Sequence, residues 1–453
     1  MKRSSYVCMF ILFCALTVLA EGTYQAGIAS VVITPDENTW LAGYASRTEP
    51  AQGAVQELYA KAITLRDTTG QQAVFVTTDL IGLTPELSNH VAKTAEKELG
   101  IPRSAVMITS SHTHCSPVLR NNLEDMYFLN QEEKAKVYRY TDQLKEKLAQ
   151  LVLDSAKELQ PVTLLRGTGH ATFGANRRAY NLDGIHFGVN PIGPVDHDVP
   201  VMVVKDLSGN ILSIIFGYAC HNTTLDINHY CGDYAGYAQE YIEQANPSAE
   251  AMFFAGCGGD INPHPRRDLQ LAKDHGRHLA DAVQKVLEGD LLEVKGELQH
   301  QFSMIDLPLS EAPGKEELQE QAQSEDKYIA QRAQRLLRQL ESEGKIPETC
   351  PYPIQVWRLG DEFIMIALGG EVVVDYSLWL KHELGKDNTW VIAYANDVMA
   401  YIPSLRVLRE GGYEGNDSMI YYGLHGPWQP TVESLIIEEV HKLVNDKQIE
   451  EQK

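Results

Sequence analysis

Two histidines lie one residue apart in the stretch ITSSHTHCSP, where His112 and His114 follow a short apolar run, Val106–Thr109, that is typical of a β-strand. In an extended chain the side chains alternate with a period of two, so both imidazoles are expected to leave the same face. Two neutral imidazoles on one face can bind a metal ion together, or one can bind the metal while the other transfers protons. The alternative is that both histidines only form hydrogen bonds at the polar end of a strand.

Other predicted strands end in residues of the same chemical kind. His221 follows a strand in CHNTTLD, and Glu371 follows another in GGE. Asp260 and Asn262 follow a third in GCGGDINPHP, and Tyr401 comes after a fourth in NDVMAYIP. Because sites in α/β sheets form at the carboxyl ends of strands, these endings are expected to share one site.

Three of these residues have the chemistry of a catalytic zinc site. Such a site takes a few ligands from His, Glu or Asp and keeps an open position for water. His112, His221 and Glu371 would supply two neutral nitrogens and one carboxylate. Bound zinc would lower the pKa of its water and polarise a carbonyl group. Calcium or magnesium would favour a site richer in oxygen. The competing interpretation is that each residue forms hydrogen bonds in its own loop.

The elements that must position these residues alternate between β-rich runs and helical stretches from residue 24 to residue 300, which predicts an α/β fold. The predicted strands are Ala73–Thr77, Val106–Thr109, Pro200–Lys205, Ile211–Ala219, Ala251–Ala255, Phe363–Leu368 and Trp390–Ala395. The predicted helices cover Lys134–Leu159, Leu269–Leu287 and Val432–Val444.

The sequence changes character over residues 306–345, which are highly charged and helix-prone. Apolar residues recur there at helical spacing: Ile329, Ala333, Leu336, Leu337 and Leu340. This stripe predicts a helical insertion that packs on the body of the protein. A lid over the site is the other interpretation.

The first residues, MKRSSYVCMFILFCALTVLAEG, have the order of a secretory signal peptide: a basic start, an apolar core and a small residue at the cleavage point. Residues 1–20 are therefore predicted to be removed, which leaves residues 21–453 as a single domain of a secreted or periplasmic protein. No later apolar run has the length of a membrane span, so stable membrane insertion is not expected. The formal charge of −22 argues against nucleic acid as a partner.

Five cysteines remain after the predicted signal peptide: Cys115, Cys220, Cys231, Cys257 and Cys350. Because the number is odd, at least one thiol must be free or paired between chains. Cys220 and Cys231 are the predicted bridge, since they are close in sequence across a polar loop. Cys115, Cys220 and Cys257 adjoin the site motifs, but the ligand set is complete without sulfur.

With these motifs in place, the chain resembles the N-terminal catalytic domain of the neutral (non-lysosomal) ceramidase family from about residue 24 to about residue 425. The resemblance rests on motifs in a fixed order: GIASVVITP, LAGYA, HTH, NRRAYN, VDHDVPVMVVKD, CHNTTLD, GDYAGYAQEYIE, GCGGDINP, GGE, ANDVMAYIP and EGNDSMIYYG. It implies a ceramidase-type catalytic domain with a mixed β-sheet core flanked by helices. It also implies a secreted zinc amidase that cleaves the N-acyl bond of ceramide.

Carried over position by position, the resemblance implies a Zn²⁺ site with the ligands His112, His221, Glu371 and Tyr401. His114 matches the second histidine of HTH, which faces the substrate and would act as general acid and base or stabilise an oxyanion. Tyr401 would also polarise the substrate, and Asp260 would orient a ligand. Arg177 matches an arginine of the family's substrate pocket, and we expect it to recognise the substrate together with Asn262.

Asn262 marks the main departure from the family, which has a serine essential for ceramide cleavage within GDxSP where this chain has GDINP. An amide cannot supply an alkoxide or shuttle a proton as a hydroxyl does. It can donate a hydrogen bond to an oxyanion. The family's C-terminal immunoglobulin-like domain is a second feature that this chain is expected to lack.

These features predict an exported zinc-dependent hydrolase of ceramidase type that cleaves a linear N-acyl amide with a metal-activated water. The substrate would be a small-molecule or lipid-like acylated compound that need not be a sphingolipid. One alternative is a zinc hydrolase of an ester, lactone or glycosidic bond. Another is a binding protein that retains zinc without turnover, but His114 and Tyr401 argue against it because binding alone needs neither.

Overall fold

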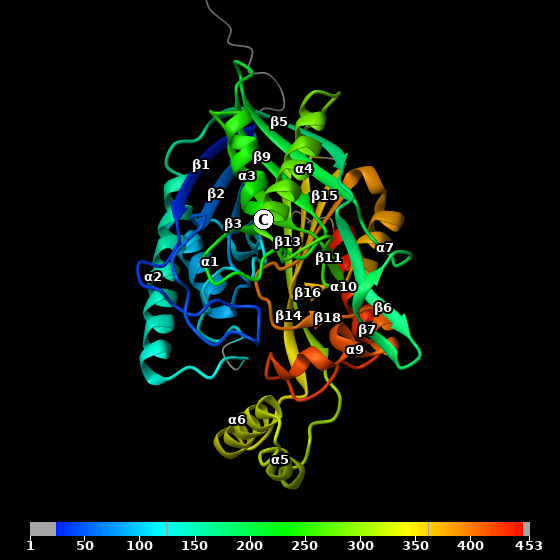
Figure 1. Cartoon of the computed structure of the whole chain (residues 1–453). Helices are drawn as coiled ribbons and strands as arrows, with labels where there is room; N and C mark the ends of the chain where they lie inside the picture. Colours follow the sequence, from blue (N-terminus) through cyan, green and yellow to red (C-terminus); the bar gives the residue numbers. More distant parts are fainter. Residues whose placement is uncertain (1–23, 124–125, 361, 447–453) are drawn as a thin grey trace, which may run out of the picture.

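The computed structural model describes residues 24–123, 126–360 and 362–446 (Figure 1). The predicted signal peptide, residues 1–20, lies outside the described residues. The largest sheet has nine strands in the order β10-β9-β8-β5-β1-β2-β3-β4, with β12 paired to β5. Its strands are β1 (Tyr24–Val32), β2 (Tyr59–Arg66), β3 (Gln72–Thr78), β4 (Val106–Ser110), β5 (Gln160–His170), β8 (Asp198–Asp206), β9 (Ile211–Tyr218), β10 (Glu250–Ala255) and β12 (Leu292–Val294). The pairs β3–β4 and β9–β10 are parallel and the others antiparallel, so the sheet is mixed.

A second sheet packs against the first. Its strand order is β13-β14-β15-β17, with the bounds Leu298–Pro308, Thr349–Leu359, Phe363–Leu368 and Thr389–Ile392. Ring contacts join the two sheets: Phe75 of β3 lies 4.6 Å from Trp357 of β14, and Phe254 of β10 lies 5.6 Å from Trp390 of β17, measured between ring centroids. The core between the sheets is therefore built from large aromatic side chains.

Helices cover the outer faces of both sheets. Those packed on the nine-stranded sheet are α1 (Pro85–Leu99), α2 (Gln131–Ser155), α3 (Asp233–Ala245) and α4 (Leu269–Leu287). Those packed on the second sheet are α7 (Val374–Leu384) and α10 (Val432–Asn445). The short helices α8 (Leu405–Glu410) and α9 (Gly412–Gly415) come between them in the chain. The predicted α/β class, with a mixed sheet and flanking helices, is confirmed.

The predicted helical insertion is also present. Helices α5 (Lys315–Gln321) and α6 (Lys327–Glu343) lie between β13 and β14, two strands that pair directly with each other. Figure 1 shows them projecting from one end of the body. The apolar stripe of α6 packs partly on α5, because Leu318, Ala333, Leu336 and Ile346 form a small buried cluster of their own.

Two small sheets complete the site. One has the order β11-β6-β7, with the bounds Ile261–Pro263, Gly174–Asn181 and Gly184–Asn190. The other pairs β16 (Glu371–Val372) with β18 (Tyr401–Ile402). Neither sheet was predicted, and for β11, β16 and β18 the reason is that strands of two or three residues carry no readable period.

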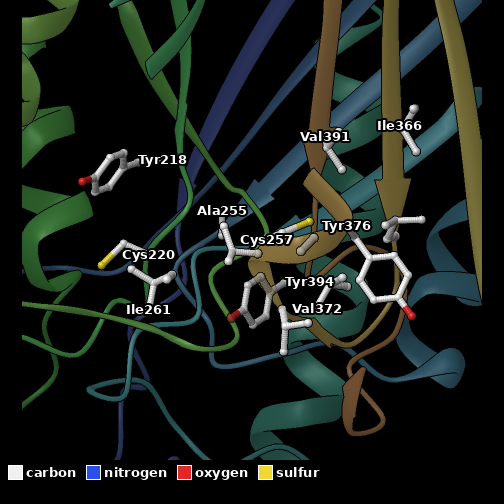
Figure 2. Packing of buried hydrophobic residues seen from close by; sticks show 14 of the residues in the cluster. Tyr218, Cys220, Ala255, Cys257, Ile261, Ile366, Val372, Tyr376, Val391 and Tyr394 are labelled. Atoms are coloured by element: carbon white, nitrogen blue, oxygen red, sulfur yellow. The ribbon is translucent and has the colours of Figure 1, made fainter. Parts of the chain in front are cut away.

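Curvature of the large sheet brings its distant strands together. Although β10 and β4 are at opposite ends of the strand order, β10 lies against both β3 and β4. Backbone hydrogen bonds then join the loops that follow: Ala393 donates to the Ala255 carbonyl at 2.9 Å, and Asn396 donates to the Ile108 carbonyl at 2.7 Å. Figure 2 shows the packing beneath these loops, where Cys257 and Tyr394 are among the buried side chains. The strand endings predicted to share a site therefore meet.

No helix in the described part of the chain is long and apolar enough to cross a membrane.

Asp397, which follows β17, provides a test of this packing. Burial raises the pKa of its carboxyl group to about 8, and the backbone N–H of Val398 offsets this only in part. In the unfolded chain the same group ionises near pH 4, so the native protein loses stability as the pH rises from about 4 to about 8. Asp397→Asn cannot ionise and is expected to gain stability relative to the native chain over that interval.

Urea unfolding at about pH 5 and about pH 8 measures the difference. The same substitution at the exposed Asp183 is the control and should show no such dependence. An Asp397→Asn advantage that is equal at both pH values would mean that the native carboxyl group is ionised when folded.

Candidate active site

The structure brings five predicted site residues together at the carboxyl ends of the strands. Nε2 of His112 and Nε2 of His221 each lie 3.0 Å from Oε2 of Glu371. Nε2 of His114 lies 3.2 Å from Nε2 of His112, and the phenol oxygen of Tyr401 lies 3.0 Å from Nε2 of His221. All five side chains are buried. Residues from four separate parts of the chain therefore form one cluster.

The backbone at His112 differs from the extended conformation that was expected. Strand β4 ends at Ser110, and His112 has a φ of +60°, in the left-handed region. The two imidazoles therefore do not leave one face of a strand as predicted, although the rings of His112 and His114 do lie 4.9 Å apart. A left-handed residue other than glycine costs about 1–2 kcal/mol, so tertiary contacts must maintain this turn. One of them is the hydrogen bond from the His112 N–H to the Leu80 carbonyl, at 2.9 Å.

Pairing between strands β16 and β18 positions Glu371 and Tyr401. Strands β16 and β18 are parallel, and Glu371 is opposite Tyr401 in their register. The backbone N–H of Glu371 donates to the carbonyl of Ala400 at 2.8 Å. Two side chains thirty positions apart in sequence are thus fixed by one short pairing.

Hydrogen bonds show which nitrogen of each imidazole carries the proton. Nδ1 of His112 lies 2.5 Å from the carbonyl oxygen of Ile81, and Nδ1 of His221 lies 2.6 Å from that of Gly258. A carbonyl group only accepts, so each Nδ1–H donates and each Nε2 presents a lone pair towards Glu371. These backbone contacts are the usual support of metal-binding histidines.

The charge states agree with this arrangement. Burial, followed by the charge of Arg177, lowers the pKa of His221 to about 4, so its ring is neutral. Oε2 of Glu371 has no hydrogen-bond donor. Three acceptor atoms therefore face one another without a proton, an arrangement that a cation among them would stabilise.

The donor set fits a metal ion. The nitrogen atoms offered by His112, His114 and His221 lie within 4.8 Å of one another. Two imidazole nitrogens and one carboxylate, with a phenol beside them, suit zinc better than calcium or magnesium.

His114 differs from the other two histidines. Its Nδ1 is buried without a hydrogen-bond partner, and a Cβ added to Gly43 would lie 2.2 Å from that atom. The ring of Tyr44 packs on it at 4.7 Å between centroids, and a guanidinium nitrogen of Arg47 donates to its carbonyl at 2.8 Å. His114 is thus held by packing and by its backbone, without the Nδ1 contact that His112 and His221 share.

Arg177 connects the cluster to its surroundings. It donates from Nε to Glu414 at 2.7 Å, from one terminal nitrogen to Oδ1 of Asn262 at 3.2 Å, and from the other to the phenol oxygen of Tyr401 at 3.0 Å. Oδ1 of Asn262 also accepts from the hydroxyl of Thr223 at 3.3 Å. Two donors therefore occupy the amide oxygen, which leaves the NH₂ group of Asn262 as the part available to a ligand.

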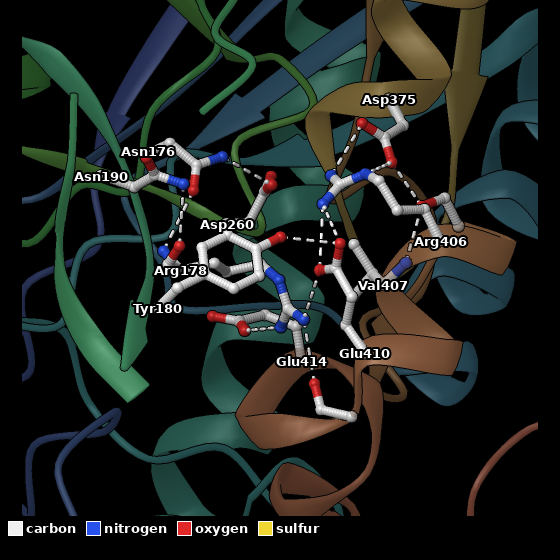
Figure 3. A network of polar contacts seen from close by, with 12 residues as sticks. Asn176, Arg178, Tyr180, Asn190, Asp260, Asp375, Arg406, Val407, Glu410 and Glu414 are labelled. Carbon is white, nitrogen blue, oxygen red and sulfur yellow. Dashed lines mark hydrogen bonds and ion pairs between the residues drawn. The ribbon is translucent and has the colours of Figure 1, made fainter. Parts of the chain in front are cut away.

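Glu414 joins a network of charges that the sequence did not indicate (Figure 3), which is buried at Arg178 and half-buried farther out. Its second oxygen accepts from Arg178 at 2.6 Å, and Arg178 also donates to Glu410 at 3.0 Å. Arg406 then donates to Glu410 at 3.0 Å and to Asp375 at 2.9 Å. Removing one partner of a buried pair typically costs about 3–5 kcal/mol, so the buried pairs of Glu414 fix the position of Arg177 firmly.

Asp260 supports the site without touching an imidazole. Its carboxylate accepts from the backbone N–H of Val374 at 2.8 Å and from the amide of Asn176 at 3.0 Å. The first bond holds the chain just after Glu371, and the second holds the residue before Arg177. The predicted role of orienting a ligand can therefore only be indirect.

Tyr422 is a site residue that the sequence reasoning missed. Its hydroxyl donates a short hydrogen bond to Oε1 of Glu371, and it is half-buried. Tyr394 was missed as well, although its ring lies 4.5 Å from that of His112. Both stand in loops, where residue spacing carries no information. The only signal was the resemblance, since EGNDSMIYYG contains Tyr422.

The predicted Cys220–Cys231 bridge is wrong. All five cysteines of the described residues are free thiols. Cys231 packs with Cys115, and its backbone N–H donates to the Cys115 carbonyl at 3.0 Å, while Cys220 lies in the main core. Burial raises the pKa of Cys220 well above its ordinary value, so this thiol is neutral. Closeness in sequence was not a guide to closeness in space.

A cavity of about 570 Å³ opens beside the cluster. Predicted site residues in its wall are His114, Arg177, Asn262 and Tyr401. Other wall residues, Phe187 and Val189, belong to β7, and Tyr413 belongs to α9. The volume is that of a small-molecule site.

An α/β fold with a polar cluster at converging strand ends defines a protein with an enzyme-like site. The family model for the N-terminal region of neutral/alkaline non-lysosomal ceramidases matches residues 24–266, so the chain belongs to this family. The matched range contains His112, His114, His221 and Asn262, and it ends before Glu371.

Individual neutral ceramidases also match this chain. Neutral ceramidase B and neutral ceramidase A of Dictyostelium discoideum are 25% identical over 269 residues and 26% identical over 270 residues. These matches cover 54% of this chain and 36% and 37% of the relatives, so the chain spans about a third of the curated relatives it matches. Among solved structures, neutral ceramidase from Pseudomonas aeruginosa shares the fold, with a TM-score of 0.70, 18% identity, and coverage of 92% of this chain and 73% of that one. A ceramidase complexed with C2 matches equally well, with a TM-score of 0.70.

The contrast between the histidines predicts different effects of substitution. His112→Ala and His221→Ala each remove a nitrogen that faces Glu371, and we expect zinc content to fall from about one ion per chain to near zero. His114→Ala should retain the zinc. Elemental analysis after dialysis measures this, with His170→Ala, an exposed histidine, as the control. Loss of zinc from His114→Ala would show that His114 is a ligand.

Proposed function

We propose that the protein is an exported zinc-dependent hydrolase of ceramidase type that cleaves the amide bond of a linear N-acyl compound. The observation that carries the proposal is the meeting of Oε2 of Glu371 with Nε2 of His112 and His221, three acceptors with no proton between them. Family membership supports the ceramidase type of chemistry. Export rests on the signal-peptide pattern of residues 1–20.

His114 is proposed to move protons. A bound zinc ion would activate a water molecule and polarise the carbonyl group of the substrate. Burial, followed by the charges of His112 and His221, lowers the pKa of His114 well below its ordinary value, so its ring is neutral. A neutral imidazole in the cavity wall can take a proton from water and pass it to the leaving amine.

Asn262 and Tyr401 are proposed to hold the carbonyl oxygen as negative charge develops on it. The NH₂ group of Asn262 is available because Arg177 and Thr223 occupy its oxygen. Burial raises the pKa of Tyr401 well above its ordinary value, so the phenol keeps its proton and can donate it in a hydrogen bond. Losing one such donor typically lowers turnover about 100-fold or more.

Because this chain has Asn262 where the family has a serine, ceramide itself is not the proposed substrate. Asn262 can bind a substrate but cannot take part in proton or acyl transfer as a serine can. The substrate is therefore proposed to be an acylated amine other than a sphingolipid.

A panel of substrates tests this function. The purified chain, stripped with a chelator and reloaded with zinc, should hydrolyse N-acyl amines only when reloaded, and should cleave the matching esters, lactones and glycosides more slowly. Short-chain ceramide should be a poor substrate. Turnover that survives complete stripping would contradict the zinc mechanism, and rapid cleavage of ceramide would contradict the argument from Asn262.

Gly43 allows the position of His114 to be tested without replacing it. Gly43→Ala places a methyl group 2.2 Å from Nδ1 of His114, which must displace the ring. Turnover should fall at least about 10-fold while zinc content stays the same, because general acid–base catalysis is worth roughly 100-fold or more.

Gly70→Ala is the matched control. Gly70 has the same positive φ of +93°, but nothing lies within 4 Å of the added methyl group. Equal turnover in the two variants would show that the reaction does not depend on where His114 lies.

A further inference from the structure

The wall of the cavity is positively charged in a strongly acidic protein. Three of its residues are arginines: Arg177, Arg266 and Arg267. No Asp or Glu residue of the described chain is among the residues that line it. With a formal charge of −22 on the whole chain, a cavity wall with cations and without carboxylates is an exception that points to the charge of its ligand.

The three arginines are not equivalent. Arg177 is already paired with Glu414 at 2.7 Å. Arg267 is 71% exposed and lies 3.7 Å from Asp226, a loose pair at the surface. Arg266 has no carboxylate partner within 4.0 Å among the described residues, and its Nε is buried without a hydrogen bond. An unpaired, half-buried guanidinium group is therefore left at the cavity.

Arg266 is held close to the reactive cluster. A terminal nitrogen of its guanidinium group donates to the hydroxyl of Tyr44 at 3.2 Å, and the ring of Tyr44 packs against His114 at 4.7 Å between centroids. One aromatic side chain thus separates Arg266 from His114. The chain positions it between β11, which is paired with β6, and the N-terminus of α4.

A different part of the wall is apolar. The rings of Phe187 and Tyr413 lie 4.9 Å apart, and those of Tyr413 and Tyr421 lie 6.3 Å apart, so they form a continuous surface. Phe187 is 54% exposed and Val189 is 47% exposed, both from β7. Exposed apolar side chains beside a cavity are typical of a site for an apolar group.

We propose that the substrate is an anionic amide, whose amine part carries a carboxylate or similar group that pairs with Arg266 and whose acyl part lies on Phe187, Tyr413 and Tyr421. An N-acyl amino acid is the simplest compound of this class. Hydrolysis would break its C–N bond, with the hydroxyl group of water going to the acyl carbon and hydrogen to the nitrogen, to give a fatty acid and a free amino acid. The proposal rests on the amidase function proposed above and specifies its substrate.

A pair of substrates that differ only in charge tests the inference. N-dodecanoylglycine and N-dodecanoylglycinamide have the same size, but only the first carries a carboxylate. The zinc-loaded native protein should have a kcat/KM at least about 10-fold higher for the acid, since a charge-assisted hydrogen bond in a partly buried site supplies that much discrimination.

Substitutions test whether Arg266 causes the preference for the acid over the amide. Arg266→Ala should abolish the preference for the acid, and Arg266→Lys should keep part of it because the charge remains while the planar fork is lost. Arg139→Ala removes an exposed arginine of α2 that pairs with Glu37, and it should keep the full preference. The preference should also shrink at high salt.

The outcomes separate this inference from the proposed function. Hydrolysis of both compounds at equal rates would overturn the anionic substrate and leave the amidase function intact. If neither compound is hydrolysed, the amidase function fails for this class, and calorimetric binding of the two compounds still decides the role of Arg266. Tighter binding of the acid that is lost in Arg266→Ala would support it, and equal binding of acid and amide would overturn it.

Discussion

The structure of the site depends on the repulsion between three acceptors. His112 and His221 each direct a lone pair at Glu371 across 3.0 Å, and each imidazole has its proton committed to a backbone carbonyl on the far side. A protein does not arrange buried acceptors in this way without a compensating positive charge. The second carboxylate oxygen of Glu371 is occupied by Tyr422, so the group cannot turn away. The apparently unfavourable contact is the property that gives the site its affinity for a cation.

Keeping that contact in place requires the surrounding loops to be fixed by backbone hydrogen bonds. The N–H of His221 donates to the Ile261 carbonyl at 2.9 Å, and the N–H of Gly259 donates to the Val372 carbonyl at 2.8 Å. The loop after β9 is thus tied to the loop after β10, and that loop is tied to the segment carrying Glu371. The left-handed turn at His112 is tolerated because backbone hydrogen bonds hold it, from the N–H of His112 to the Leu80 carbonyl and from the N–H of His114 to the Asn222 carbonyl. Curvature of the nine-stranded sheet makes these bonds possible, since it places β10 against β4.

The arginines around the cluster of His112, His221 and Glu371 differ in whether a carboxylate balances their charge. Arg177 and Arg178 are balanced by Glu414 and Glu410, so they contribute position more than net charge. Arg266 has no such balance and leaves the cavity electropositive. Asn262 fits the same scheme, because its oxygen faces Arg177 and its NH₂ group remains for a ligand. The cavity therefore offers donors and positive charge to whatever enters it.

The sequence by itself determined the class of fold, most of the long elements and the identity of the residues that could do chemistry. Strand β15 and helix α4 have the predicted bounds, since alternation and helical spacing are local properties of the chain. His112, His221, Glu371 and Tyr401 could be named because their residue types, and the family motifs around them, are also local. The expectation that both imidazoles leave one face of a strand was wrong, since β4 ends at Ser110 and His112 takes a left-handed conformation, which changes where each side chain points.

Only the tertiary structure decided which residues touch. The two-residue pairing of β16 with β18, the contact of Tyr422 with Glu371 and the ion pairs of Glu414 join segments whose separation in sequence says nothing of their separation in space. The same holds for the cysteines, where the pair closest in sequence lies in different clusters. The charge of the cavity is likewise hidden in an acidic composition, because burial and pairing, which no local pattern encodes, decide which charges remain for a ligand.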